Sequence, residues 1–269
     1  MILIQIIVSL AVILAAVYFF ILVRPTKKTK PSEVLLRGYA HRGLHNGKDA
    51  PENSLAAFEA ACQKGCGIEL DVQLSRDGKV MVFHDYTLIR MTGCDKNLCE
   101  LDAEELTSLT LGDSDQRIPT FREVLALVNG RVPLLVELKG ENFDISLCKK
   151  VADLLRKYQG PYCIESFNPL LIGTMKKEMP EVFCGLLYTN VCKERQENSL
   201  INIALTAMAL NVMARPDFIA FDKGVRNSLP VKIATGFYKA PKFVWTVNKQ
   251  EELDTAHKNG EHPIFENIF

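Results

Sequence analysis

The chain has 269 residues, of which 48% are hydrophobic and 24% are charged, an ordinary composition for a globular protein. Its 32 basic and 32 acidic residues give a formal net charge of zero, so charge provides no case for a nucleic-acid partner. The length suits one barrel-sized domain or two smaller ones. Eight cysteines in so long a chain, without paired zinc-ligand spacing, argue against a disulfide scaffold and a structural zinc site.

The chain opens with an apolar segment, residues 2–23, which carries no charge and is interrupted only by Gln5 and Ser9. At about 1.5 Å per helical residue, this segment is long enough to cross a bilayer. No basic residue precedes it, and it ends in bulky side chains instead of a small-residue cleavage site. We therefore expect residues 1–23 to form an uncleaved, single-pass transmembrane anchor and not a signal peptide.

A basic linker is expected at residues 24–37, with four basic residues close to the membrane segment: Arg24, Lys27, Lys28 and Lys30. Basic residues beside a span favour the cytoplasmic side of a membrane. We therefore expect a protein of the cell membrane whose globular domain, residues 38–269, faces the cytoplasm. A linker of this length also holds the domain near the lipid headgroups.

The globular part begins with a short predicted strand that ends in His41. A helix is expected from about Leu55, because Asn53 or Ser54 can cap its amino end and Gly65 can end it. Apolar residues recur along this segment at helical spacing, which predicts that one face packs against the rest of the domain.

The most informative segment of the sequence is residues 67–85, whose pattern predicts a β-hairpin. Its first strand alternates so that Glu69 and Asp71 lie on the same face. An Asp-Gly pair at 77–78 predicts a tight turn, and the returning strand brings His84 back to the level of the two carboxylates. An edge strand with solvated acids is the alternative, but the apolar residues between the acids favour burial.

After the hairpin, residues 86–118 show no clear strand, and a short helix is expected near 103–109. A Thr-x-x-Glu capping box at Thr120 begins a longer helix that Gly130 ends. Strands and helices alternate from there onward. The expected strands are 132–139, 161–167, 182–188, 218–222, 242–247 and 262–266, and the expected helices are 145–158, 169–178, 199–209, 226–237 and 249–259.

These short apolar strands are typical of parallel strands that are covered on both faces. If the returning strand of the hairpin lies outside the main sheet, eight strands remain, each parallel to the last. Eight βα units in about 230 residues have the size of a (β/α)8 barrel. The predicted fold class is therefore α/β: a TIM barrel with a small insertion after strand two, preceded by one transmembrane helix.

In such a barrel the functional residues lie at the carboxyl ends of the strands. Glu69 and Asp71 lie there on the second strand, and Glu137 lies there on the third. Three carboxylates suit a hard divalent cation, Mg²⁺ or Ca²⁺, better than zinc or copper, because no cysteine or histidine need join them. The sequence therefore predicts a metal site at this end of the barrel.

Two cationic side chains, Arg42 and Lys139, are expected beside the metal and favour an anionic substrate, with phosphate as the leading candidate. Two histidines at one site, His41 and His84, allow one general base and one general acid. Together these residues indicate phosphodiester cleavage.

A known family carries the same motifs in the same order and at the same spacing. The motifs are His41-Arg42-Gly43, Pro51-Glu52-Asn53, Glu69-Leu70-Asp71-Val72, Asp77-Gly78, His84-Asp85, Glu137-Leu138-Lys139, Ser166-Phe167 and Trp245-Thr246-Val247-Asn248. Over residues 39–266 the chain resembles the glycerophosphodiester phosphodiesterase family. The resemblance implies a barrel with an insertion after strand two, and glycerol 3-phosphate and an alcohol as products. It also implies a divalent metal and an acid/base pair, with Glu69, Asp71 and Glu137 as metal ligands, Glu52 nearby, and His41 and His84 as the pair.

The sequence departs from the family pattern in its last strand. The family usually reads Gly-x-Asp-Gly-Ile-x-Thr-Asp, whereas residues 259–267 read Asn-Gly-Glu-His-Pro-Ile-Phe-Glu-Asn. Whether Glu266 or Asn267 enters the site is therefore left open, although every matched catalytic position is present.

Four side chains near the predicted site also have alternative roles. Glu52 either contacts the metal or braces the first loop. Trp245 either forms an aromatic wall for the glycerol group, the interpretation that we favour, or packs in the core. Glu165 and Phe167 are undecided, and Phe167 is included with Arg42, Lys139 and Trp245 among the candidate substrate-binding residues.

Two functions of different classes fit these residues. The first is a hydrolase in which one histidine deprotonates a water or the neighbouring glycerol hydroxyl and the other protonates the leaving alcohol. The second is a membrane-anchored module that binds a phosphodiester without cleaving it. Retention of both histidines and all three acids favours the hydrolase. The substrate is a soluble glycerophosphodiester or a membrane-derived diester such as a lysophospholipid.

Overall fold

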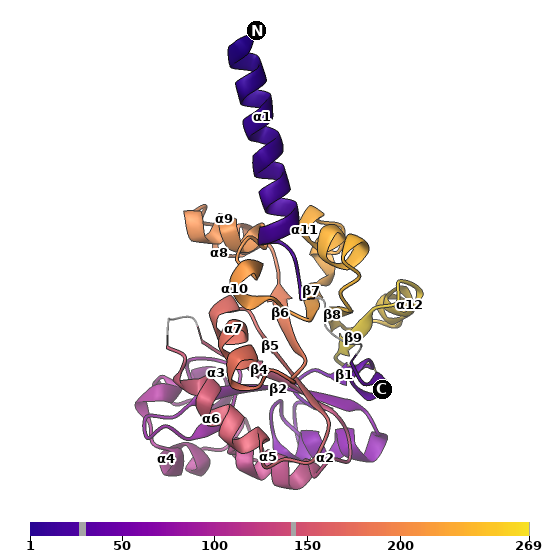
Figure 1. Cartoon of the computed structure of the whole chain (residues 1–269). Coiled ribbons are helices and arrows are strands. Elements are labelled where there is room, and N and C mark those ends of the chain that lie inside the picture. Colours follow the sequence, from indigo (N-terminus) through magenta and orange to yellow (C-terminus); the bar gives the residue numbers. More distant parts are fainter. Residues whose placement is uncertain (27–30, 141–143, 269) are drawn as a thin grey trace.

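The computed structural model describes residues 1–26, 31–140 and 144–268. Within these residues, parallel strands close into a barrel because β1 pairs with both β9 and β2 (Figure 1). The barrel strands are β1 (Tyr39–Ala40), β2 (Gly67–Leu74), β4 (Leu134–Leu138), β5 (Tyr162–Ser166), β6 (Cys184–Tyr188), β7 (Phe218–Asp222), β8 (Lys242–Val247) and β9 (His262–Phe265). The predicted eight-stranded parallel barrel is confirmed, and each expected strand is present.

Helices cover the outside of the barrel. They are α2 (Leu55–Lys64), α5 (Phe121–Val128), α6 (Ser146–Leu155), α7 (Pro169–Glu178), α8 (Val191–Arg195), α9 (Leu200–Thr206), α10 (Asn211–Ala214), α11 (Leu229–Val231) and α12 (Gln250–Lys258). The 3₁₀ turn η4 (Lys223–Val225) precedes α11, and the π-helix η5 (Lys232–Phe237) continues from it. The helix expected over 226–237 is thus shorter and less regular than predicted, and the short helices α8 and α10 were missed.

The insertion after β2 has a small core of its own. Strand β3 (Val80–Val82) runs antiparallel to β2 and stays outside the parallel barrel, as the hairpin pattern predicted. Behind it lie α3 (Ile89–Thr92), η3 (Leu98–Glu100) and α4 (Ala103–Ser108), which bury a leucine-rich cluster against β3. This small core includes Phe83 and therefore fixes the segment after β3, which carries His84.

The start of α2 resolves the choice between two capping residues. Ser54 is the cap, because its hydroxyl accepts a hydrogen bond from the backbone N–H of Ala57 at 3.1 Å. Asn53 instead donates its side-chain amide to Asp71. Gly65 ends the helix with a φ of +68°, as expected for a carboxyl-terminal glycine.

Strand alternation separates apolar from acidic side chains along β2. Ile68, Leu70 and Val72 belong to the buried layer between the strands and the helices. Glu69 and Asp71 therefore project into the barrel, where they are also buried. Other inward side chains, including those of Tyr39, Leu135, Phe218 and Phe243, form a separate apolar cluster inside the barrel. The barrel interior thus has an apolar section and an acidic section.

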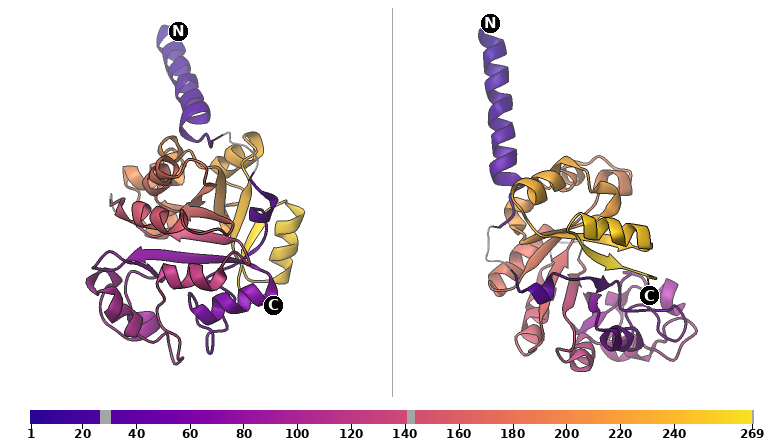
Figure 2. Two further views of the ribbon diagram at one scale, coloured as in Figure 1. Left: turned by 60° about the horizontal axis from the view of Figure 1, so that its bottom comes forward. Right: turned by 90° about the vertical axis from the view of Figure 1, so that its right-hand side faces the viewer.

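The amino-terminal segment forms α1 (Ile2–Val17) and continues as the π-helix η1 (Tyr18–Leu22). Its first part projects away from the barrel in all three views (Figures 1 and 2). Residues Ile2–Leu22 are long and apolar enough to cross a membrane by length and composition, a test that a signal sequence also passes. Of the basic residues used for the topology prediction, Lys27, Lys28 and Lys30 lie outside the described residues.

Both described ends of the expected linker, residues 24–37, contact the barrel. Pro25 is buried at its amino end. At its carboxyl end η2 (Glu33–Leu35) places Leu35 in the apolar cluster inside the barrel. The described parts of the linker therefore pack against the globular domain.

Candidate active site

The acidic section of the barrel results from the register of three adjacent strands. Asp71 of β2 lies opposite Glu137 of β4, and Glu137 lies opposite Glu165 of β5. Glu69 lies two residues earlier on β2, and therefore on the same inward face. All four side chains are buried. Parallel register thus places at one level acids that are far apart in the sequence.

Three of these carboxylates form a group that can hold a metal ion. One oxygen atom from each of Glu69, Asp71 and Glu137 lies within 4.8 Å of the others. Burial, and then repulsion from Asp71 and Glu137, raises the pKa of Glu69 well above its ordinary value. Burial also raises the pKa of Glu137 to about 7, although Lys139 opposes the shift. A buried cluster of like charges with only oxygen donors suits a hard divalent cation, which would offset this repulsion.

Lys139 and Arg42 supply positive charge to the same group. The Lys139 ammonium lies 2.9 Å from Asp71 Oδ1 and 2.8 Å from Glu137 Oε1. Arg42 contributes its backbone N–H, which donates to Glu69 Oε2 at 2.8 Å, and its guanidinium Nε lies 3.7 Å from Asp71 Oδ2. Burial alone would raise the pKa of Asp71, but Lys139, then His84 and Arg42, hold it below the ordinary value.

Each predicted acid/base histidine has one ring nitrogen paired with a carboxylate. His41 Nδ1 lies 3.1 Å from Glu266 Oε2, and His84 Nδ1 lies 2.6 Å from Asp85 Oδ1. Burial lowers the pKa of His84, and Asp71 opposes this effect. A carboxylate at Nδ1 fixes the orientation of the ring and directs Nε2 to the role of proton donor or acceptor.

Glu52 takes part in a chain of ion pairs at the edge of this group. Its carboxylate pairs with Arg42 at 2.8 Å and with Arg90 at 2.6 Å, and Arg90 pairs in turn with Asp85 at 2.5 Å. Among the described residues, the carboxylate group that can hold a metal does not include Glu52. The contacts of Glu52 thus link the first loop to the insertion that carries His84.

The two predicted aromatic residues meet across the barrel mouth. Phe167 follows β5 and Trp245 lies on β8, and their rings contact edge to face with centroids 5.6 Å apart. The Trp245 indole N–H donates to the carbonyl of Ala220 at 3.2 Å. Phe167 is 39% exposed, so it retains a surface that a substrate can contact.

Three site residues were missed or left undecided by the sequence interpretation. Asn53, which was one of two candidates to cap α2, instead donates to Asp71 Oδ2 at 2.8 Å. Glu165 is buried beside the other acids, and its Oε2 has no hydrogen-bond partner within the described part of the chain. Glu266 contacts His41 and also lies 3.5 Å from His45. The position of Glu165 on the strand after Glu137 was a signal that could have identified it.

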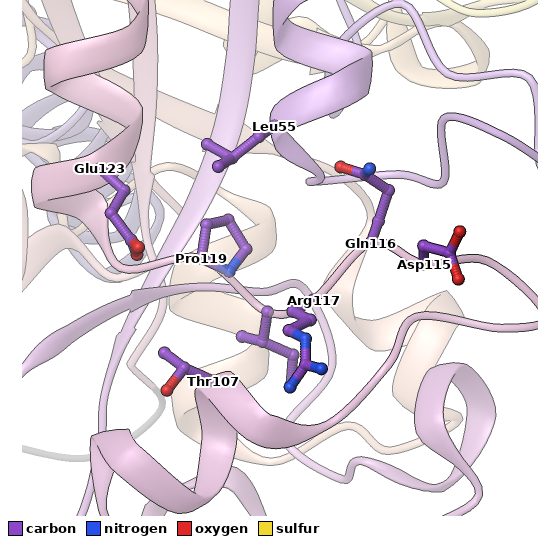
Figure 3. Close-up of a pocket in the computed structure, with 8 residues that line it drawn as sticks. Leu55, Thr107, Asp115, Gln116, Arg117, Pro119 and Glu123 are labelled. Carbon is purple, nitrogen blue, oxygen red and sulfur yellow. The ribbon is translucent and has the colours of Figure 1, made fainter.

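A separate hollow lies between the insertion and helices α2 and α5 (Figure 3). It is lined by Leu55, Thr107, Asp115, Gln116, Arg117, Ile118, Pro119 and Glu123. None of the predicted site residues lines it. The arrangement of charged groups at the strand ends, and not this hollow, therefore defines the candidate active site.

Comparisons with known proteins agree with this geometry. The model of the glycerophosphoryl diester phosphodiesterase family matches residues 41–267. The glycerophosphodiester phosphodiesterase of Caldanaerobacter subterraneus subsp. tengcongensis is 31% identical over 232 residues, which cover 82% of this chain and 89% of the relative.

Two solved structures share the fold. A phosphodiesterase from Oleispira antarctica in complex with the product sn-glycerol-3-phosphate superposes with a TM-score of 0.69 at 24% identity, covering 87% of this chain and 94% of that one. A glycerophosphodiester phosphodiesterase from Thermotoga maritima gives a TM-score of 0.63 at 26% identity, covering 86% and 93%. From its barrel, its acidic group and these matches, the chain belongs to the glycerophosphoryl diester phosphodiesterase family.

Proposed function

We propose that this protein is a phosphodiesterase that hydrolyses glycerophosphodiesters to glycerol 3-phosphate, or a related phosphomonoester, and an alcohol. The observation that carries this proposal is the position of two carboxylate-paired histidines beside one buried acidic group. A module that only binds a phosphodiester would need neither histidine in this arrangement.

A divalent cation, Mg²⁺ or Ca²⁺, fits Glu69, Asp71 and Glu137. Their oxygen atoms lie close enough together to share one ion, and their burial leaves negative charge that Lys139 and Arg42 only partly offset. When bound, such a cation would polarise a phosphoryl oxygen and stabilise the charge that develops on it. Glu52 is already held by two arginines, so its role in this proposal is to position Arg42 and not to bind the metal.

The remaining steps belong to side chains of this chain. Arg42 and Lys139 attract and orient the phosphate group. One of His41 and His84 takes a proton at Nε2 from the nucleophile, a water or the neighbouring glycerol hydroxyl, and the other gives a proton to the leaving alcohol. Phe167 and Trp245 offer an aromatic surface for the apolar edge of the glycerol group.

A substrate screen with metal control tests the activity. The full-length protein in detergent is incubated with glycerophosphodiesters and, separately, with lysophospholipids, and the release of phosphomonoester and alcohol is measured. We expect cleavage that chelation abolishes and that Mg²⁺ or Ca²⁺ restores, and the Glu69→Ala protein should lose activity by orders of magnitude because it lacks one carboxylate ligand. Full activity in excess chelator would rule out the metal, and no cleavage of either set would rule out the function.

We also propose that α1 and η1 anchor the protein in the cell membrane with the barrel in the cytoplasm. This proposal rests on the uncharged, predominantly apolar sequence and on the basic residues that follow it. Protease added to intact cells should leave the barrel uncut, and a membrane-impermeant thiol reagent should fail to label the exposed Cys99 until the cells are lysed. Cleavage or labelling of intact cells would reverse the topology and favour scavenging of soluble diesters.

A further inference from the structure

The end of the membrane helix is fixed to the barrel by direct contacts. The Tyr18 hydroxyl donates to the carbonyl of Ala207 at 2.9 Å, and the Tyr238 hydroxyl donates to the carbonyl of Phe19 at 2.9 Å. Val23 is fully buried. Contacts from several barrel segments thus fix the direction of the helix relative to the barrel.

The next residues continue this attachment. The Asn211 side-chain amide donates to the carbonyl of Val23 at 3.0 Å, and the backbone N–H of Thr26 donates to the carbonyl of Pro216 at 2.8 Å. The Lys176 ammonium bonds both the Thr26 hydroxyl, at 2.9 Å, and Asp217, at 2.8 Å. A helix held in this way determines which face of the barrel lies against a membrane that the helix crosses.

Exposed apolar side chains surround the same junction. In Figure 1, α9 and α11 lie on either side of the lower end of α1. Leu200 and Ile201 at the start of α9 are 88% and 55% exposed, Leu229 at the start of α11 is 64% exposed, and Phe237 at the end of η5 is 60% exposed. Phe237 also contacts the ring of Phe19 with centroids 4.7 Å apart, so the Phe237 part of this apolar surface adjoins the membrane helix directly.

Basic side chains border the apolar surface. Arg24 lies directly after the membrane segment, Lys232 begins η5 and Lys239 follows its end; all three are exposed. An apolar surface with a basic border is the pattern of a segment that inserts its apolar side chains among acyl chains while its cations meet anionic headgroups.

We propose that Leu200, Ile201, Leu229 and Phe237 form a second membrane-contact surface, which inserts into the lipid beside the anchor and sets the orientation of the barrel. This proposal rests on the proposed membrane anchor and is independent of the catalytic activity. Helix α9 follows the carboxyl end of β6, and α11 follows the carboxyl end of β7. Phe237 precedes the amino end of β8, so the contact surface lies on the outer helices beside β6, β7 and β8.

Tryptophan fluorescence with brominated lipid tests this surface. The chain has one natural tryptophan, so each added tryptophan is compared with the unsubstituted protein. Full-length Leu200→Trp and Ile201→Trp proteins are placed in vesicles of phosphatidylcholine and phosphatidylglycerol with or without bromine on the acyl chains. We expect brominated lipid to reduce the added emission of both variants. These two side chains are exposed, so neither substitution disturbs the core.

Two control variants separate this proposal from the anchor. Leu10→Trp lies within the membrane segment and should be quenched if that segment crosses the bilayer. Ile145→Trp replaces another exposed apolar residue, just before α6 in the half of the barrel away from α1, and should keep its emission (Figure 1). Quenching at position 10 without quenching at position 200 or 201 would overturn the contact surface but not the anchor. The apolar side chains would then face water or a second copy of the chain. Absence of quenching at Leu10 would overturn the anchor and, with it, this proposal.

Discussion

Two regions of this barrel break the usual rule of burial in opposite ways. At the carboxyl ends of β2, β4 and β5, four carboxylates are buried. Around the foot of the amino-terminal helix, on α9, α11 and η5, large apolar side chains are exposed. Burying like charges is costly without a cation, and exposing an apolar surface is costly without a partner.

The two regions therefore call for different partners. In the functions proposed above, a metal and an anionic substrate complete the acidic region, and lipid covers the apolar region. Elsewhere the barrel follows ordinary packing, with apolar side chains between its strands and helices. Each prediction below alters the acidic region alone and should leave the apolar region unaffected.

The largest effect is expected from the histidines. His41→Ala and His84→Ala should each lower kcat by about 10²–10⁴-fold, because each removes one group that transfers a proton in the reaction. The double variant should lose much less than the product of the two losses, since both groups serve one reaction. Steady-state kinetics with a glycerophosphodiester measure this, and the exposed His257 gives a control, His257→Ala, which should be near neutral. Wild-type turnover by His84→Ala would show that the hairpin takes no part in catalysis.

A smaller effect is expected from Glu266, which contacts His41 but none of the three predicted metal ligands in the described structure. Glu266→Gln should lower kcat by about 10–100-fold, the equivalent of a charged hydrogen bond of about 1.5–3 kcal/mol. KM should change little, because Glu266 orients a ring and does not hold the substrate. His45→Ala removes the other histidine partner of Glu266 and should retain most of the activity. A loss confined to KM would instead indicate that Glu266 contacts the substrate.

The smallest effect concerns stability. The pKa of Glu137 is raised from 4.5 to about 7 by burial, so its neutral form is favoured in the folded protein. In chelator, its contribution to the free energy of unfolding should therefore fall as pH rises from about 4.5 to about 7. We expect Tm to drop over this interval, on the order of 2–4 °C for each kcal/mol lost, and added Mg²⁺ or Ca²⁺ to raise Tm more at pH 7.5 than at pH 5.

Thermal melts of wild type and Glu137→Gln, each with and without metal, measure this contribution. The variant cannot ionise at this position, so its Tm in chelator should depend less on pH than that of wild type. Identical pH dependence in the two proteins would show that Glu137 is already ionised in the metal-free state.

Local patterns in the sequence determined most of the fold. Alternation over residues 67–74 and the Asp-Gly turn predicted the hairpin, and the Thr120 capping box predicted α5. The end of α5 was misplaced by one residue, because Asn129 adopts the left-handed conformation expected of Gly130. The segment 226–237 was predicted less well, because α11 begins only at Leu229, with Pro230 in its first turn, and the helix changes from α to π after Val231.

The sequence also identified the candidate side chains for metal binding and proton transfer, because residue type and spacing along one strand are local properties. Only the tertiary structure decided their partners. Glu266 lies 225 residues from His41 in the sequence. Asn53, in the loop before α2, donates a hydrogen bond to Asp71 on β2. The contact between Phe237 and Phe19 could not be predicted either, since nothing in the pattern of one segment indicates that it packs against the other. Contacts between distant segments depend on barrel register and closure, which arise only when all the strands are assembled.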